Sequence, residues 1–197
     1  MRNDRATGVR RLLTFVLPVA VVLTLGGCSS GVGDTDTGGV ALVVSQFDGL
    51  PSQVSVNDAA AVGLVTVDEF QLESIVENPS QGVSDLQTIE LRTYEVRYSR
   101  ADSGQRVPTP LVERIFSTVP PGGTSTFNNL PILRNEQLLN PPLSDLLFVN
   151  GGFDTETGSE VIRLNLHVRF FGRTLGGRDV VSSTQSFTVE FVPDFGL

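Results

Sequence analysis

A strict alternation of apolar and polar residues near the C-terminus constrains the fold of this chain more than any other feature. Within residues 161–170 the even positions are all apolar: Ile162, Leu164, Leu166, Val168 and Phe170. Successive side chains of a β-strand point to opposite faces, so this pattern predicts a strand with one buried face and one polar face. A second alternating run places Phe187, Val189 and Phe191 inward. The glycine-rich turn between the two runs predicts a β-hairpin.

The preceding residues, from 40 onward, also have the composition of strands separated by turns. Strands are expected over residues 40–47, 62–76, 86–98, 111–119 and 124–133, the last at a sheet edge because of Pro131. Apolar parity changes near Asp68–Glu69 and near Arg92, which predicts a bulge or a switch of buried face at both places. Residues 135–147 hold several leucines around two prolines and are expected to form a loop with one or two helical turns.

About seven or more strands with little helical periodicity indicate an all-β fold, a single antiparallel β-sandwich. The closing pair of strands resembles the last two strands of bacterial immunoglobulin-like domains, so an immunoglobulin-like domain is expected over residues 40–197. The resemblance is architectural and carries no functional residues. Residues 28–39 are small, polar and glycine-rich, and they predict a flexible linker because they cannot bury apolar area.

The N-terminus has the layout of a secretory signal peptide. Four arginines precede an apolar run from Leu12 to Leu25. That run is shorter than the roughly 20 residues that a membrane-spanning helix needs. A basic start, a short apolar core and then small residues are typical of a cleaved signal. The pair Arg10-Arg11 also fits twin-arginine export, but its surroundings favour ordinary secretion.

The residues that close this run, Leu25-Gly26-Gly27-Cys28, resemble the lipobox of bacterial lipoproteins. The resemblance implies that residues 1–27 are removed and that the Cys28 thiol carries a lipid anchor with palmitate-type acyl chains. It therefore implies a protein of the bacterial cell envelope, attached to a membrane through Cys28. In a host with two membranes, Ser29 favours the outer membrane, at either its periplasmic or its surface face.

The charge of the chain excludes some classes of partner. The net charge is −8, and removal of residues 1–27, which carry a net +3, leaves −11. Such a charge argues against nucleic acid as a partner. Residues 28–91 contain acids but no base, and every mature arginine lies at or after Arg92. Pairing of the two halves across strands is favoured over an acidic face for a cationic partner.

Residues suited to catalysis are scarce. The chain has one histidine, His167, which is expected to be an exposed residue on the polar face of a strand. One histidine and one lipidated cysteine, Cys28, are too few for the usual zinc site. The carboxylates closest together for acid–base hydrolysis are Asp68, Glu69 and Glu73, and no tryptophan accompanies them. The chain is therefore expected not to be an enzyme, with a hydrolase as the least favoured alternative.

Asp154, Glu156 and Glu160 surround Gly158 just before the alternating strand. Carboxylate oxygens at alternate positions suit calcium, although an ordinary polar loop turned by the glycine is favoured. No other cofactor is expected.

A row of three residues on the polar face of that strand, Arg163, His167 and Arg169, is a candidate partner surface. It suits an acidic protein, an anionic sugar or a lipid head group. The same residues suit pairing with carboxylates on adjacent strands equally well.

The sequence thus favours a lipid-anchored envelope protein whose non-catalytic sandwich binds an unidentified envelope protein or has a structural role. A calcium- or small-ligand-binding envelope module is the alternative.

The first prediction concerns processing. Because the basic start, the apolar run and the Leu-Gly-Gly-Cys sequence agree in order, the mature protein is expected to begin at an acylated Cys28. Intact-mass spectrometry of the membrane-extracted protein measures this directly. A Cys28→Ser chain is expected to stay unlipidated and uncleaved. A mature N-terminus upstream of residue 28, or an unmodified cysteine, would contradict the prediction.

Overall fold

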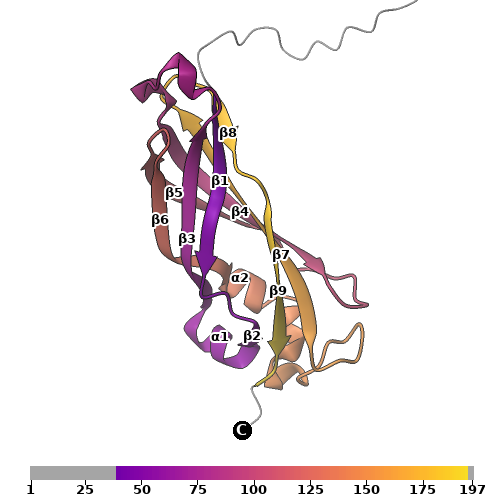
Figure 1. Cartoon of the computed structure of the whole chain (residues 1–197). Helices are drawn as coiled ribbons and strands as arrows, with labels where there is room; N and C mark the ends of the chain where they lie inside the picture. Colours follow the sequence, from indigo (N-terminus) through magenta and orange to yellow (C-terminus); the bar gives the residue numbers. More distant parts are fainter. Residues whose placement is uncertain (1–38, 195–197) are drawn as a thin grey trace, which may run out of the picture. The chain divides into compact units, whose positions relative to one another are not determined.

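Two β-sheets pack face to face in the computed structural model, which describes residues 39–194 (Figure 1). The predicted signal peptide, Cys28 and the linker up to residue 38 lie outside these residues. The smaller sheet is antiparallel, with the strand order β1-β3-β6. Its strands are β1 (Val40–Asp48), β3 (Leu64–Val76) and β6 (Thr124–Arg134). As predicted, the strand that contains Pro131 lies at a sheet edge.

The larger sheet has the order β2-β9-β7-β4-β5, and β8 pairs with the end of β7. Its strands are β2 (Gln53–Ser55), β4 (Ile89–Arg100), β5 (Leu111–Val119), β7 (Ile162–Thr174), β8 (Asp179–Val181) and β9 (Gln185–Val192). All pairings are antiparallel except that of β2 with β9. The predicted all-β sandwich is confirmed, and the predicted hairpin gains the short strand β8 between its two arms.

Both predicted switches of buried face are present. In β3 the buried positions change from Val67 to Phe70 across the exposed Asp68. In β4 the pairing with both neighbours shifts between Leu91 and Thr93, which is a bulge at Arg92. A bulge adds one residue to one strand and increases its local twist. The strand can therefore keep facing the core as the sandwich turns.

Phe170 of β7 joins the two sheets at the centre of the core. Its side chain is fully buried, and its ring lies 5.7 Å from that of Phe70, 5.8 Å from that of Tyr94 and 6.3 Å from that of Phe127, between ring centroids. Phe70 and Phe127 belong to the smaller sheet, and Tyr94 belongs to the larger one. Aromatic contacts at these distances add to the stabilisation that comes from burial.

Two tyrosines of β4 hydrogen-bond across the sandwich to β6. The Tyr94 hydroxyl donates to the Pro131 carbonyl at 2.8 Å, and the Tyr98 hydroxyl donates to the Ile132 carbonyl at 2.7 Å. Burial raises the pKa of both phenols, so they stay protonated and remain donors. These bonds fix the relative position of the two sheets.

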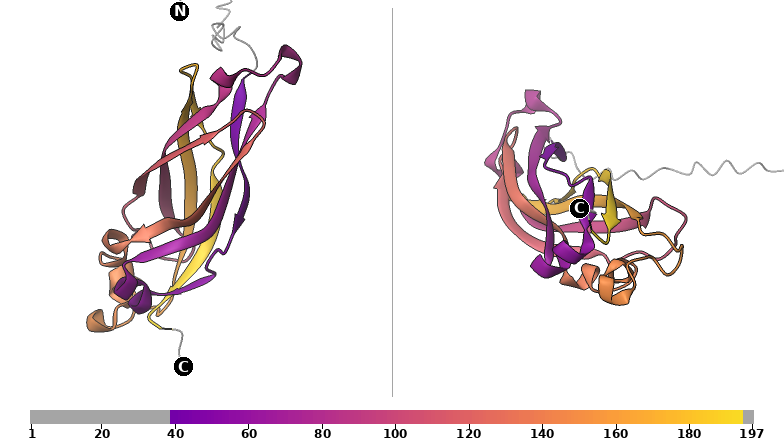
Figure 2. Two further views of the ribbon diagram at one scale, coloured as in Figure 1. Left: turned by 90° about the vertical axis from the view of Figure 1, so that its left-hand side faces the viewer. Right: turned by 90° about the horizontal axis from the view of Figure 1, so that it is seen from below.

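The sandwich has two distinct ends (Figure 2). At the entry end the chain joins β1 at Gly39, beside the loops of residues 77–88, 120–123 and 175–178. The first of these loops contains the 3-10 helices η1 (Pro79–Gln81) and η2 (Asp85–Gln87). The far end carries the loops of residues 101–110 and 151–161 together with the short helices. These are α1 (Val56–Val62), α2 (Asn135–Leu138), η3 (Leu143–Leu146) and η4 (Phe148–Asn150).

The sequence pattern predicted the turns of α2 and η3 but not α1. Ser55 begins α1 by accepting a hydrogen bond from the Asp58 amide, and Gly63 ends it with a φ of 80°. No helix within residues 39–194 is long and apolar enough to cross a membrane.

The strand register makes a prediction about stability. Leu166 is fully buried, whereas the neighbouring His167 lies on the outer face of β7. Leu166→Ala is expected to lower the free energy of unfolding by about 2–5 kcal/mol. His167→Ala removes only part-exposed hydrogen bonds and is expected to cost about 1 kcal/mol or less. Denaturant titration measures both changes. Equal losses would show that the register is wrong.

Candidate functional site

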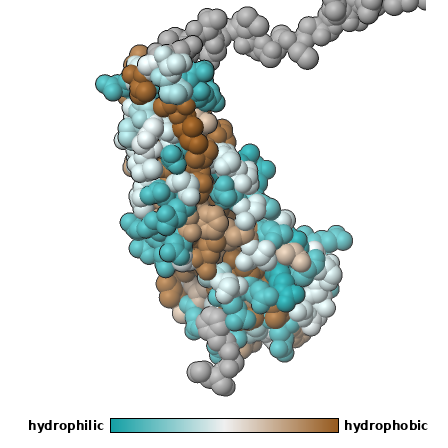
Figure 3. Space-filling view, viewed as in Figure 1, coloured by the Kyte–Doolittle hydropathy of each residue, from teal (hydrophilic) through white to brown (hydrophobic). Residues whose placement is uncertain are grey.

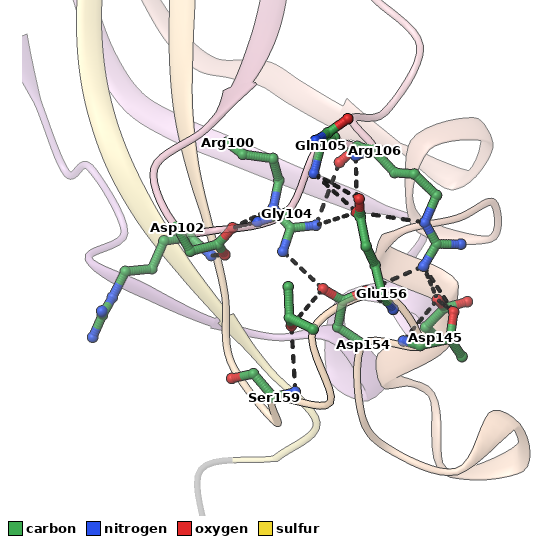
Figure 4. Close-up of polar contacts among 12 residues, drawn as sticks. Arg100, Asp102, Gly104, Gln105, Arg106, Asp145, Asp154, Glu156 and Ser159 are labelled. Carbon is green, nitrogen blue, oxygen red and sulfur yellow. Dashed lines mark hydrogen bonds and ion pairs between the residues drawn. The ribbon is translucent and has the colours of Figure 1, made fainter.

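A cluster of ion pairs lies inside the far end of the sandwich (Figure 4). Arg100, the last residue of β4, has a side chain only 3% exposed, and that of Asp154 is completely buried. Arg100 Nη2 donates to Asp154 Oδ2 at 2.8 Å, and Arg100 Nε donates to Asp102 Oδ1 at 2.6 Å. The Arg100 guanidinium group therefore bridges two carboxylates that lie on different loops.

A second arginine extends the cluster toward the surface. Arg106 Nη2 lies 2.7 Å from Asp145 Oδ2 and 3.1 Å from Asp154 Oδ1. Asp154 is therefore shared by two guanidinium groups, and Asp145 brings the helix η3 into the same network. The Arg106 side chain is 40% exposed, so its contacts are screened by water more than those of Arg100.

Backbone amides occupy further carboxylate oxygens of the cluster. Glu156 accepts from the amides of Gln105 and Arg106 at 2.9 and 3.0 Å. Asp154 Oδ1 accepts from the Glu156 amide at 3.1 Å, and Asp102 Oδ1 accepts from the Gly104 amide at 3.0 Å. Amides of the loop of residues 101–110 therefore bind Asp102 of the same loop and Glu156 of the other loop. The Glu156 amide binds Asp154 within its own loop.

Gly104 shows how closely the first loop approaches the cluster. A Cβ atom at this position would lie 2.3 Å from the guanidinium carbon of Arg100. A side chain at this position would therefore force the Arg100 guanidinium group to move away from its carboxylate partners.

Hydrogen bonding keeps these carboxyl groups ionised despite burial. Burial alone would raise the pKa of Asp154, but hydrogen bonds from Arg100, the Glu156 amide and the Thr157 hydroxyl lower it to about 2. The pKa values of Asp102 and Asp145 are lowered in the same way against the effect of burial. The amides of Arg106 and Gln105 lower the pKa of Glu156.

The cluster has the properties of a structural clasp. A catalytic acid or base has to exchange protons near neutral pH, whereas Asp154 is held ionised far below it and is closed to water. Every buried side-chain polar atom of the cluster has a hydrogen-bond partner. Within residues 39–194 the one such atom without a partner is Ser74 Oγ, which lies on β3, outside the cluster. We call the four residues Arg100, Asp102, Arg106 and Asp154 the clasp.

The cluster contains two of the three residues that the sequence proposed for calcium. Asp154 and Glu156 face guanidinium groups and amides, and Glu160 is exposed just before β7. Among the described residues no group of three or more His, Cys, Asp and Glu side chains is placed to hold a metal ion. The calcium site stays a prediction made from the sequence.

The outer face of β7 carries the row proposed as a partner surface. Arg163 Nε donates to Glu190 Oε1 at 2.7 Å, and Arg169 Nη2 donates to Glu95 Oε2 at 3.1 Å. Both arginines thus pair with carboxylates of adjacent strands, which is the second of the two alternatives considered from the sequence. The row stays a prediction as a partner surface.

His167 occupies the middle of this row, with both ring nitrogens bonded to serine hydroxyls. Nε2 lies 2.9 Å from the Ser99 hydroxyl, and Nδ1 lies 2.7 Å from the Ser186 hydroxyl. The ring is therefore held between the neighbouring strands β4 and β9.

The carboxylates considered for hydrolysis lie on β3, the middle strand of the smaller sheet. Asp68 is exposed, and Glu69 and Glu73 are half-buried. A separate cavity of about 490 Å³ lies beside the sheet edges β5 and β6. There Arg134 Nε donates to Glu113, so these two charged groups that line the cavity neutralise each other.

The arginines of the clasp were missed at the sequence level, although one signal was available. The buried positions of β4 after its bulge are even-numbered, Tyr94, Val96 and Tyr98. Arg100 continues this parity, so the pattern places an arginine where a core residue is expected. A buried arginine requires a buried partner. The sequence does not say which carboxylate supplies it.

A matched pair of substitutions distinguishes the clasp from a surface ion pair. Asp154→Asn keeps the shape of the side chain but leaves Arg100 with one buried carboxylate fewer. It is expected to lower the free energy of unfolding by about 3–5 kcal/mol. Glu190→Gln breaks the exposed pair with Arg163 and is expected to cost about 1 kcal/mol or less. Denaturant titration of both variants is the measurement. A small effect at Asp154 would refute the clasp.

The lowered carboxyl pKa values also predict a dependence on pH. An aspartate in the unfolded chain titrates near pH 4, whereas the pKa of Asp154 in the folded chain is about 2. The stabilisation is therefore complete above about pH 4 and is lost as the pH falls toward 2. Unfolding titrations across this range should show a shallower decline for Asp154→Asn. The same slope in both proteins would contradict the prediction.

Comparisons with known proteins give this site no counterpart. No protein-family model matches the chain, and neither a curated protein nor a solved structure does. The function is therefore inferred from the chain's own residues and their contacts.

Proposed function

We propose that this chain is a lipid-anchored protein of the bacterial cell envelope and that its β-sandwich has a non-catalytic role in binding another envelope protein. The lipid anchor rests on the sequence Leu25-Gly26-Gly27-Cys28 after a basic and then an apolar segment. The binding role rests on the far end of the sandwich, which lies opposite the point where the chain enters the fold (Figure 1).

The observation that carries the proposal is the clasp. It ties the loop of residues 101–110 to the loop of residues 151–161 through the contact of Arg106 with the fully buried carboxylate of Asp154. Loops that are already held in one conformation lose little conformational entropy when a partner binds, so the binding free energy is not reduced by the cost of ordering them.

The surface next to the clasp is apolar and exposed. The exposed fractions are 61% for Phe148, 88% for Val149 and 45% for Phe153. The rings of Phe148 and Phe153 both lie against the turn at Gly151 and Gly152. Phe148 and Val149 lie on η4, which directly precedes the loop of residues 151–161 that carries Phe153. Exposed aromatic and aliphatic side chains grouped on one surface are typical of protein-binding sites. We therefore place the partner at η4 and the start of this loop.

The alternative, a calcium-binding module, has less support from the geometry. Calcium at the predicted position would have to displace Arg100 and Arg106 from Asp154, and two backbone amides from Glu156. These contacts already satisfy the carboxylates.

The test is capture of a partner from detergent-solubilised envelope with the anchored protein as bait. Phe148→Ser with Val149→Ser is expected to abolish capture of the protein retained by the unchanged chain, because it removes the apolar contact surface. Val112→Ser with Phe116→Ser is the matched control, since these residues are 62% and 85% exposed on β5. Loss of capture in the control alone, or equal capture by all three proteins, would contradict the proposal.

A further inference from the structure

We infer that the entry end of the sandwich rests on the lipid bilayer and places Val83, Leu86 and Leu175 in contact with lipid. This inference builds on the proposed function, because it requires the anchor at Cys28. It adds that the domain has a defined orientation: the entry end faces the membrane and the clasp faces away from it.

The point where the chain enters the fold is fixed against this surface. The Gly39 carbonyl accepts a hydrogen bond from the Glu77 amide at 2.8 Å, and Arg178 Nη2 donates to the Val40 carbonyl at 2.8 Å. A Cβ atom on Gly39 would lie 2.2 Å from Glu77 Oε2. The first described residue is therefore packed between the loops of residues 77–88 and 175–178.

These two loops carry the exposed aliphatic side chains. The exposed fractions are 59% for Val83, 62% for Leu86 and 49% for Leu175. The Gly176 amide donates to the Leu86 carbonyl at 2.8 Å, and the Leu175 amide donates to the Thr88 carbonyl at 2.9 Å. The loops are thus joined side by side. Residues of hydrophobic type are visible at this end of the molecule, where the surface is coloured brown (Figure 3).

The length of the chain between anchor and fold brings this surface to the membrane. Eleven residue steps separate Cys28 from Gly39, and a fully extended chain gains at most about 3.6 Å per residue. The entry end therefore stays within about 40 Å of the anchored cysteine. A contact too weak to bind lipid alone becomes occupied when a tether holds it at high effective concentration. Membrane anchoring by lipid chains is commonly completed by such a second signal.

The charges at this end favour an apolar contact over an electrostatic one. The acids Glu77, Asp85 and Asp179 are accompanied by Arg173 and Arg178, so the end has no basic excess. Attraction to anionic lipid requires such an excess. Zwitterionic lipid is therefore sufficient for the contact, and it is the appropriate probe.

The absence of tryptophan from the sequence allows a direct test. Leu86→Trp and Leu175→Trp each place one indole fluorophore at the entry end, and Val149→Trp places one at the far end. Each membrane-extracted protein is reconstituted into vesicles of phosphatidylcholine, with or without phosphatidylcholine brominated in its acyl chains. Circular dichroism confirms that each variant is folded, and mass spectrometry reports acylation of Cys28 in the same samples.

Bromine is expected to quench the indole emission of the Leu86→Trp and Leu175→Trp variants and to leave the emission of the Val149→Trp variant unaffected. An acylated protein whose entry-end variants are not quenched would overturn the inference and leave the proposed anchor intact. Quenching of the Val149→Trp variant alone would overturn it in favour of the reverse orientation. An unacylated Cys28 would overturn both the proposed function and the inference.

Discussion

The far end of this protein depends on one buried ion pair, Arg100 with Asp154. A charge without water is costly unless it is paired and hydrogen-bonded, so neither residue can leave the contact without penalty. The pair joins residues 54 positions apart in the sequence. Cys28 is the only cysteine of the chain, so no disulfide within the chain can hold these loops together. The clasp performs that role through electrostatics and hydrogen bonding.

The clasp continues the sandwich that supports it. Tyr94, Val96 and Tyr98 of β4 face the core. Arg100, two residues after Tyr98, has its side chain on the same face of the strand. The inward-facing side of β4 is therefore apolar through the core and ends in a buried charged residue, Arg100, next to the loops of the far end. The same strand bonds to β6 through Tyr94 and Tyr98, so the core and the clasp are positioned by one element. A shift of β4 would disturb both at once.

The two ends differ in chemistry, and the proposed function uses this difference. The entry end exposes three aliphatic side chains, those of Val83, Leu86 and Leu175, next to the point where the chain enters the fold. The far end exposes Phe148 and Phe153 on a loop next to the clasp. We propose lipid contact for the aliphatic side chains because they lie beside the point where the chain enters the fold. We propose a protein partner for the far end because aromatic residues are enriched among the residues that dominate protein–protein binding.

The strands could be predicted from sequence because period-two alternation directly reports which face is buried. That pattern predicted β7 and β9, and the parity changes predicted the face switches in β3 and β4. The helix α1 was missed, and its last residue, Val62, was assigned to the strand that follows. The strands β2 and β8 have three residues each, too few to show an alternation of apolar and polar side chains.

The site was predicted only in part, for a different physical reason. Asp154 and Glu156 were identified as acidic loop residues, but the loop pattern contains no information about which distant residue meets them. Arg100 binds the carboxylate of Asp154, which the sequence offered as a possible calcium ligand. Local periodicity determines faces and turns, whereas contacts between loops depend on how the whole sandwich closes.

Hydrogen–deuterium exchange of the loop amides tests the clasp most directly. The amides of Gly104, Gln105, Arg106 and Glu156 all donate to carboxylates of the cluster. They should therefore be protected in the unchanged protein although they lie in loops. Asp154→Asn should release this protection while β7 stays protected. Fast exchange of these amides in the unchanged protein, at the rate found in the variant, would show that the buried ion pair does not hold the loops.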